Sequence, residues 1–190
     1  MAYTEKTFDL PDLEGLSKDQ VEAHLGLYAG YVKHVNLIAE KLSAVRDGSL
    51  ELDPYIVAEL RRRFAFEFDG MRMHEYYFTQ FEGGPKEMDA GSKLAELSQK
   101  YGEQGLEGHI REVAGSRGIG WVVVYQDGDQ LHTTFVADHE LGQLAGLTVV
   151  LALDVWEHAF MVDYLPSEKG KYIDAFFANL NWSVVEGRVQ

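Results

Sequence analysis

The chain has 190 residues, enough for one domain or two small ones that share a core. It has no cysteine, which excludes disulfides, thiolate metal ligands and a thiol nucleophile. A formal net charge of −14, from 17 basic and 31 acidic residues, argues against a nucleic-acid partner. Residues 1–16 lack the features of an export signal, and no apolar run approaches the ~20 residues that cross a bilayer. We therefore expect a cytoplasmic protein that does not bind membranes.

Two long helices are predicted in the first half of the chain. Residues 17–20 (Ser-Lys-Asp-Gln) have the spacing of a capping box, and a helical pattern runs from there to about Arg46. Asp53 and Pro54 supply a cap and a first-turn proline for a second helix, which should end near Phe81. Because the link between the helices is short, they should form an antiparallel hairpin.

The second half changes to strand patterns. The expected elements, in chain order, are helices near 92–101 and 103–115, strands at 120–125, 131–137 and 147–155, and helices near 169–180 and 182–188. Residues 127–129 (Asp-Gly-Asp) predict a hairpin turn between the first two strands. We therefore expect an α+β fold. A helical hairpin over residues 1–85 should pack on a C-terminal domain, residues 86–190, with a three-stranded antiparallel sheet and helices.

The last predicted strand ends in a carboxylate, Asp154, and an imidazole follows four residues later at His158. A buried carboxylate is unfavourable unless a cation or a hydrogen-bond donor meets it. A carboxylate and an imidazole at the end of one core strand can close on the same metal ion. The alternative is that Asp154 caps the next helix and that His158 is a hydrogen-bonded residue of the core.

Two further histidines lie on the predicted long helices, His24 on the first and His74 on the second. A lone histidine on an apolar helix face is usually a hydrogen-bonded core residue. A helical hairpin, however, can bring one residue from each arm together. With Asp154 and His158 the set would contain three imidazoles and one carboxylate, which suits iron or manganese and lacks the thiolates of structural zinc.

Residues 154–159 (Asp-Val-Trp-Glu-His-Ala) resemble the Asp-x-Trp-Glu-His-Ala signature of the iron/manganese superoxide dismutase family. Four other motifs of that family occur in the same order: His24 with Tyr31-Val32, His74 with residues 76–78 and 82–84, Gly118-Ile119-Gly120-Trp121, and Asn181-Trp182. The resemblance covers nearly the whole chain. On these five motifs the chain is identified as a member of the family.

The resemblance implies a metal site between the two halves of the chain. His24, His74, Asp154 and His158 would bind one iron or manganese ion, with iron slightly favoured, and a solvent molecule would be the fifth ligand. The implied reaction is superoxide dismutation: one superoxide is oxidised to dioxygen, and a second takes two protons and is reduced to hydrogen peroxide. The alternative is a non-catalytic metal-binding or interaction protein on the same fold.

The resemblance also implies an outer-sphere partner for the bound solvent. Family members usually place a glutamine there, from the second helix or from the sheet. Here the helix position is Gly70, which has no side chain, and the sheet position falls on His139. We therefore expect His139 to hydrogen-bond to the bound solvent and to tune the metal. The alternative is an exposed loop histidine.

Four aromatic residues are expected to line the pocket because of their places in the family motifs: Tyr31 at its mouth, with Trp121, Trp156 and Tyr77. The spacing between His24 and Tyr31 is one residue shorter than usual in the family. Positions seven apart still share a helix face. We therefore expect the first helix to be regular α, without a bulge.

A homodimer is the assembly that the resemblance implies. Glu157 would reach across a twofold interface to the ligand that follows it, His158, in the other subunit. Members commonly pair a histidine and a tyrosine across this interface, at positions that are Tyr28 and Met161 here. That bond should be absent. Met161 should pack on aromatic rings, and the Tyr28 hydroxyl should turn to solvent or to another acceptor.

An anionic substrate needs positive charge near the pocket. Exposed charges act over only about 8 Å at physiological salt, so local cations can outweigh the negative net charge. Leu27 stands where many family members have a lysine. Lys169 and Lys171 are the remaining candidates, and solvated helix ends are an equal alternative for both.

Overall fold

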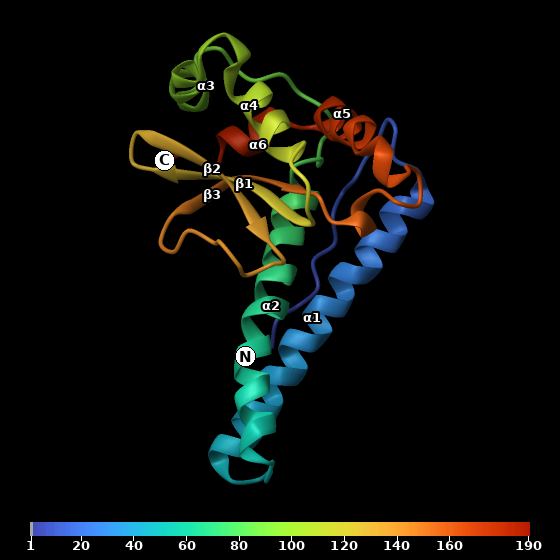
Figure 1. Cartoon of the computed structure of the whole chain (residues 1–190), viewed down its shortest axis with the longest axis vertical. Coiled ribbons are helices and arrows are strands. Elements are labelled where there is room, and N and C mark those ends of the chain that lie inside the picture. Colours follow the sequence, from blue (N-terminus) through green and yellow to red (C-terminus); the bar gives the residue numbers. More distant parts are fainter. Residues whose placement is uncertain (1) are drawn as a thin grey trace.

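Two long helices, α1 (Lys18–Asp47) and α2 (Pro54–Thr79), form an antiparallel hairpin in the computed structural model, which describes residues 2–190. The hairpin extends well beyond the sheet, so the link between its helices lies far from the rest of the chain (Figure 1). Asp53 caps α2 by accepting a hydrogen bond from the Tyr55 amide over 2.8 Å. Gly48 ends α1 in the left-handed region, at φ 81°, which a glycine adopts without strain.

The predicted capping box of α1 is only half formed. The Ser17 hydroxyl accepts a hydrogen bond from the Gln20 amide over 3.1 Å, as predicted. The Gln20 side chain does not return to Ser17. It donates to the His158 carbonyl over 2.8 Å and accepts from the Val162 amide over 2.9 Å. The Gln20 side chain therefore bonds to two residues distant in sequence, and not to Ser17 as the capping box predicts.

The sheet has the order β2-β1-β3, and both pairs of strands are antiparallel. Its strands are β1 (Gly120–Asp127), β2 (Gln130–Ala137) and β3 (Thr148–Asp154). Gly128 turns the β1–β2 hairpin at φ 56°, where the sequence predicts a turn. The central strand is almost completely buried, and its register places Trp121 opposite Asp154.

Short helices pack around the sheet at the end opposite the hairpin link (Figure 1). They are α3 (Lys93–Ser98), α4 (Gly105–Ala114), α5 (Lys169–Asn179) and α6 (Trp182–Glu186), with 3-10 segments at Gln99–Gln104, Glu157–Ala159 and Pro166–Glu168. The helix expected near 92–101 is shorter than predicted. Its second part continues as a 3-10 segment that is interrupted at Gly102, which has φ 67°.

The hairpin and the sheet are joined at the end of α2. The Gln80 side chain donates to the Ala152 carbonyl over 2.8 Å and accepts from the Ala152 amide over 2.9 Å.

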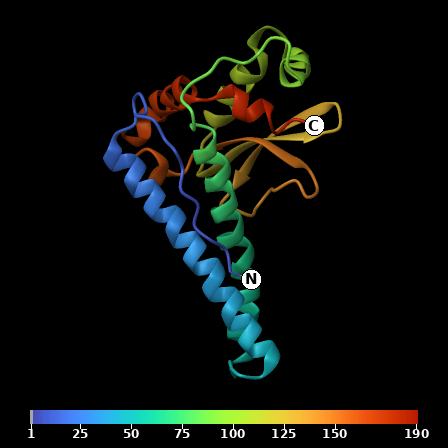
Figure 2. The same cartoon turned by 180° about the vertical axis from the view of Figure 1, so that it is seen from behind.

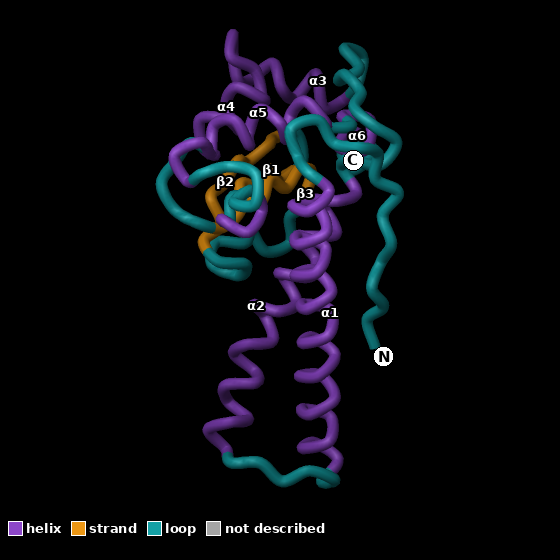
Figure 3. Tube along the Cα trace, turned by 90° about the vertical axis from the view of Figure 1, so that its right-hand side faces the viewer, coloured by secondary structure: helices purple, strands orange, loops and turns teal. Residues whose placement is uncertain are grey.

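The N-terminal segment, residues 2–16, runs along the hairpin without regular structure (Figure 2, Figure 3). Asn36 holds it by bonding to the Tyr3 amide and carbonyl over 2.7 and 2.8 Å. The predicted α+β architecture is thus confirmed.

Among residues 2–190, no helix is both long enough and apolar enough to span a bilayer.

Candidate metal centre

Four predicted ligands meet where the hairpin joins the sheet. His24 comes from the second turn of α1 and His74 from the last two turns of α2. Asp154 is the last residue of β3, and His158 lies in the 3-10 turn that follows. One ligand atom from each residue lies within 4.8 Å of all the others. The Asp154 Oδ2 atom is 3.0 Å from Nε2 of His24, 3.2 Å from Nε2 of His158 and 3.8 Å from Nε2 of His74.

His74 shows that the set fits a cation. Its Nδ1 is 2.6 Å from the Gly70 carbonyl oxygen, which can only accept, so Nδ1 carries the proton. Burial, reinforced by the charge of a protonated His24, lowers the pKa of His74 well below 6.5, so the ring is neutral. Its buried Nε2 then presents a lone pair and has no hydrogen-bond partner within residues 2–190. An orphaned acceptor that faces a buried carboxylate is unfavourable without a cation between them.

The charge of Asp154 is retained in the buried site. Burial raises the pKa of this carboxyl, but the charges and hydrogen bonds of His158 and His24 outweigh burial and hold the pKa below its usual range. Its Oδ1 atom accepts from the Trp156 amide over 2.8 Å, which turns Oδ2 toward the imidazoles. Burial lowers the pKa of His24. Three imidazoles and one carboxylate are donors suited to iron or manganese.

Aromatic rings enclose the imidazoles. Ring centroids lie 4.9 Å apart for Tyr77 and His24, 5.1 Å for Trp121 and His74, 5.1 Å for Tyr31 and His74, and 5.7 Å for Trp156 and His158. Every aromatic residue that the sequence predicts at the pocket is therefore next to a predicted ligand. His24, His74 and Asp154 are almost completely buried beside these rings, and burial lowers the effective dielectric constant, which strengthens charge interactions inside the site.

His139 connects two of these aromatic residues. The Trp121 indole N–H donates to His139 Nδ1 over 2.9 Å, so the ring of a neutral His139 carries its proton on Nε2. That Nε2 lies 2.7 Å from the Tyr31 hydroxyl oxygen and donates to it. Burial lowers the pKa of His139 to about 4, which keeps the ring neutral. The alternative of an exposed loop histidine is wrong, because His139 is completely buried.

Tyr31 is half-buried and lies farther along α1 than His24. Burial, followed by the charges of Asp154 and Glu67, raises the pKa of Tyr31 well above the usual 10. The hydroxyl therefore keeps its proton throughout the physiological range. As predicted, α1 is α-helical without interruption between His24 and Tyr31.

Gly70 makes room for Tyr31, a role that sequence reasoning did not find. A Cβ atom at Gly70 would lie 2.7 Å from Cδ1 of the Tyr31 ring, closer than two carbon atoms can approach. The same residue supplies the carbonyl that fixes the His74 ring. The sequence shows only that Gly70 lacks a side chain, because the contact depends on how α1 packs on α2.

We expect Gly70→Ala to displace the Tyr31 ring and to break its hydrogen bond to His139. Overpacking of this kind lowers the free energy of unfolding by about 1–3 kcal/mol. Urea denaturation would measure the loss. Gly26→Ala is the matched control, because a Cβ there meets no atom within 4 Å. Replacing glycine by alanine in an open helix position stabilises by roughly 0.5–1 kcal/mol. Equal effects of the two substitutions would contradict the role of Gly70.

Tyr28 and Phe66 also lie near the centre. The Tyr28 hydroxyl accepts from the Lys6 amide over 2.9 Å and donates to the Glu75 carboxylate over 3.3 Å, so it has found another acceptor, one of the two alternatives predicted. Phe66 was not predicted. Its ring lies 4.5 Å from that of His139. It precedes His74 by eight residues, about two helical turns, which places both residues on the same face of α2. This spacing is the sequence signal from which Phe66 could have been predicted.

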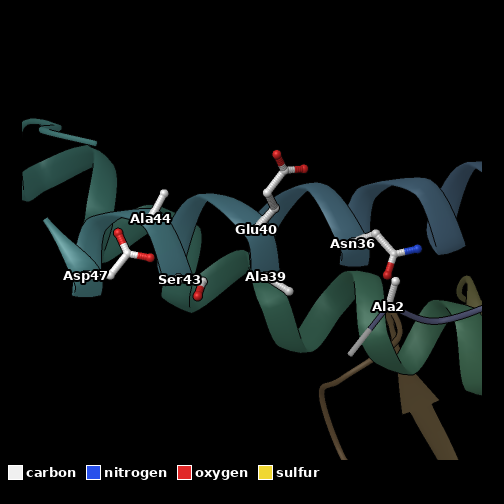
Figure 4. Close-up of a pocket in the computed structure, with 7 residues that line it drawn as sticks. All are labelled: Ala2, Asn36, Ala39, Glu40, Ser43, Ala44 and Asp47. Atoms are coloured by element: carbon white, nitrogen blue, oxygen red, sulfur yellow. The ribbon is translucent and has the colours of Figure 1, made fainter. Parts of the chain in front are cut away.

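A separate hollow of about 470 Å³ follows the outer part of α1 (Figure 4). It is lined by Ala2 and by α1 residues between Asn36 and Asp47. The lining contains no histidine and none of the four predicted ligands. The cluster at the hairpin–sheet junction is therefore the candidate site, and this hollow is not part of it.

Comparison with known proteins agrees with this geometry. Residues 91–188 match the family described as iron/manganese superoxide dismutases, C-terminal domain. The chain is 33% identical over 187 residues to "Superoxide dismutase [Fe]" of Aquifex pyrophilus, covering 94% of this chain and 86% of that protein. It is 31% identical over 176 residues to the protein of the same name from Pyrobaculum aerophilum, covering 88% and 80%.

A third relative, "Superoxide dismutase [Mn/Fe]" of Aeropyrum pernix, is 29% identical over 169 residues, covering 84% of this chain and 76% of that protein. The Aquifex pyrophilus match covers 94% of this chain, so it extends over both the hairpin and the sheet. Similarity over nearly the full length shows that the chain belongs to the iron/manganese superoxide dismutase family.

Proposed function

We propose that this protein is a superoxide dismutase with one iron or manganese ion per subunit, held by His24, His74, Asp154 and His158. The observation that carries the proposal is the buried, unpartnered Nε2 atom of His74, which faces the Asp154 carboxylate within residues 2–190. When bound, the metal supplies the one-electron redox change that converts superoxide to dioxygen and hydrogen peroxide. Iron is favoured, because relatives are named for iron or for both metals.

Tyr31 and His139 are the proposed proton-handling residues. Reduction of superoxide to hydrogen peroxide takes up two protons, so the pocket needs a protonated donor. The raised pKa of Tyr31 keeps its hydroxyl protonated, with burial as the largest cause. Since His139 already donates to the Tyr31 oxygen, the Tyr31 proton is free to point into the pocket. Trp121 and Trp156 hold His139 in place, through a hydrogen bond of 2.9 Å and a ring stacked at 5.1 Å between centroids. Tyr77 packs on the predicted ligand His24.

A metal-resolved activity assay tests the proposal. The metal-free protein would be loaded separately with iron and with manganese, and each form assayed for loss of superoxide and for metal content. We expect one ion per chain and superoxide-dependent turnover in at least one form. Free metal salts and zinc-loaded protein serve as controls. Stoichiometric metal without turnover would refute the enzyme and favour the non-catalytic alternative.

We infer that the protein is a homodimer closed around Glu157. This residue is exposed, and its carboxylate makes no hydrogen bond or ion pair with residues 2–190. Large apolar side chains nearby are also exposed, including Ile119 at 40%, Met161 at 46% and Val162 at 56%. Exposed apolar side chains beside an unpaired carboxylate suit a twofold interface, in which the same surface of each subunit is in contact. A monomer in light scattering at micromolar concentration would contradict the dimer.

We expect Met161→Leu to leave the affinity of the dimer nearly unchanged. The two side chains have similar volumes, and a thioether sulfur is only a weak hydrogen-bond acceptor. Glu157→Ala, in contrast, should weaken the dimer by at least tenfold, because it removes the proposed contact to His158 of the partner subunit. Sedimentation over a concentration series would measure both. A large loss in Met161→Leu would show that Met161 makes a specific contact across the interface.

A further inference from the structure

A buried carboxylate on α2 lies near Tyr31, the residue expected at the mouth of the pocket. Glu67 is only 5% exposed, although it carries a charge that repels an anion. Its Oε2 atom is 3.8 Å from Nδ1 of His34, which lies one turn beyond Tyr31 on α1. Glu67 is also near enough to Tyr31 to help raise the pKa of that hydroxyl, after burial and Asp154. An anion that passes Tyr31 therefore approaches this carboxylate.

Arg63 covers Glu67 on its solvent side. The Arg63 Nε atom donates to Glu67 Oε1 over 2.8 Å, and the arginine side chain is 43% exposed while that of the glutamate is 7% exposed. The guanidinium lies 3.7 Å over the Phe66 ring, which in turn packs 4.5 Å from the His139 ring. Arg63 is thus connected to the pocket through a single aromatic ring.

The other candidate cations are engaged elsewhere. The Lys171 ammonium pairs with Glu168 at 2.6 Å, and the Lys169 ammonium donates to the Ser116 carbonyl over 3.1 Å. Leu27 offers no charge. Since screening limits exposed charges to about 8 Å, the net charge of −14 matters less at the mouth than the pair of charges beside it.

We propose that Arg63 is the residue that cancels the Glu67 charge at the pocket mouth and so permits a small anion to enter. Glu67 is buried where α2 packs on α1, with Arg63 bonded to its carboxylate over 2.8 Å, and Arg63 prevents its charge from repelling the substrate. The inference rests on the proposed function, because it assumes an anionic substrate. Arg63 acts here through Glu67 and is a positioning residue, not a catalytic one.

Azide binding to the iron-loaded protein tests this inference without turnover. Azide is a small monovalent anion, and its binding changes the absorption of the iron site. We expect Arg63→Gln to raise the Kd for azide by roughly three- to tenfold, with the larger change at low ionic strength. Arg62→Gln is the matched control, because Arg62 pairs with the exposed Glu59 at 2.7 Å. It should change the Kd by less than about twofold.

The double variant Arg63→Gln/Glu67→Gln distinguishes cancellation from direct attraction. If Arg63 acts by cancelling Glu67, removing both charges should return the Kd to within about twofold of the original. Glu67→Gln alone should bind azide more tightly. These two variants leave no unpaired buried charge, so they remain informative if Arg63→Gln fails to fold.

Two results would overturn the inference: equal Kd values in Arg63→Gln and Arg62→Gln, or a double variant as weak as the single one. The proposed function can be refuted independently of this inference about Arg63. A protein that binds azide as expected but does not consume superoxide would refute the dismutase and leave the role of Arg63 standing.

Discussion

His74→Ala should abolish metal retention and dismutase activity together. The substitution removes the one ligand atom that is buried and unpartnered within residues 2–190. Changing a residue that only supports a ligand typically costs 10–100-fold in metal affinity, so losing a ligand should cost at least about 100-fold. Metal analysis after dialysis would show less than one ion per ten chains, and activity should fall in parallel.

Thermal unfolding gives a second measurement of the same change. A metal that binds only the folded state raises the unfolding temperature of the original protein, and this rise should disappear in His74→Ala. His132→Ala is the control, because the His132 side chain is 41% exposed and lies on β2, outside the ligand cluster. Full activity in His74→Ala, or a metal content of only zinc in active protein, would refute the ligand assignment.

His139→Ala should retain the metal and lose activity by roughly 10–100-fold, the range expected for a residue that supports the site from outside the ligands. The substitution leaves the Trp121 indole N–H without its acceptor and the Tyr31 hydroxyl without its donor. A buried polar group left unpaired costs about 1–3 kcal/mol, so stability should also fall. Metal content, activity and the reduction potential would be measured on the same sample.

His139→Gln provides the matched comparison. An amide side chain offers both a donor and an acceptor, as the neutral imidazole does, so it can bridge Trp121 and Tyr31. We therefore expect His139→Gln to recover part of the activity and most of the stability lost in His139→Ala. Loss of the metal in His139→Ala would place His139 among the ligands and contradict its supporting role.

Local sequence patterns predicted the elements of this fold well, because the signals are local. The Asp53 cap and the turn at Gly128 each depend on neighbouring residues, and each occurs where it was expected. The prediction of the capping box was half wrong because its second hydrogen bond competes with partners distant in sequence. Gln20 found partners at His158 and Val162, far along the chain, and no local pattern reports such a competitor.

The residues of the candidate site also divide into those with a local sequence signal and those that depend on long-range packing. Asp154 and His158 were suggested by a carboxylate at the end of a buried strand, whereas uniting them with His24 and His74 required the arrangement of the hairpin or the family resemblance. The fit of Tyr31 over Gly70 was not predictable, because it depends on the distance between two helices. The charge pair of Arg63 and Glu67 has helical spacing, but the sequence does not show which face is buried.

Gln20 has a consequence for how the ion is exchanged. Its side chain ties the first turn of α1 to the segment that carries His158, by one donated and one accepted hydrogen bond. His24 follows one turn later on the same helix. His24 and His158 therefore cannot separate until the two Gln20 hydrogen bonds break. We therefore expect a bound ion to leave slowly, because the two halves of the chain must part first. The ion available during folding would then determine whether the site holds iron or manganese.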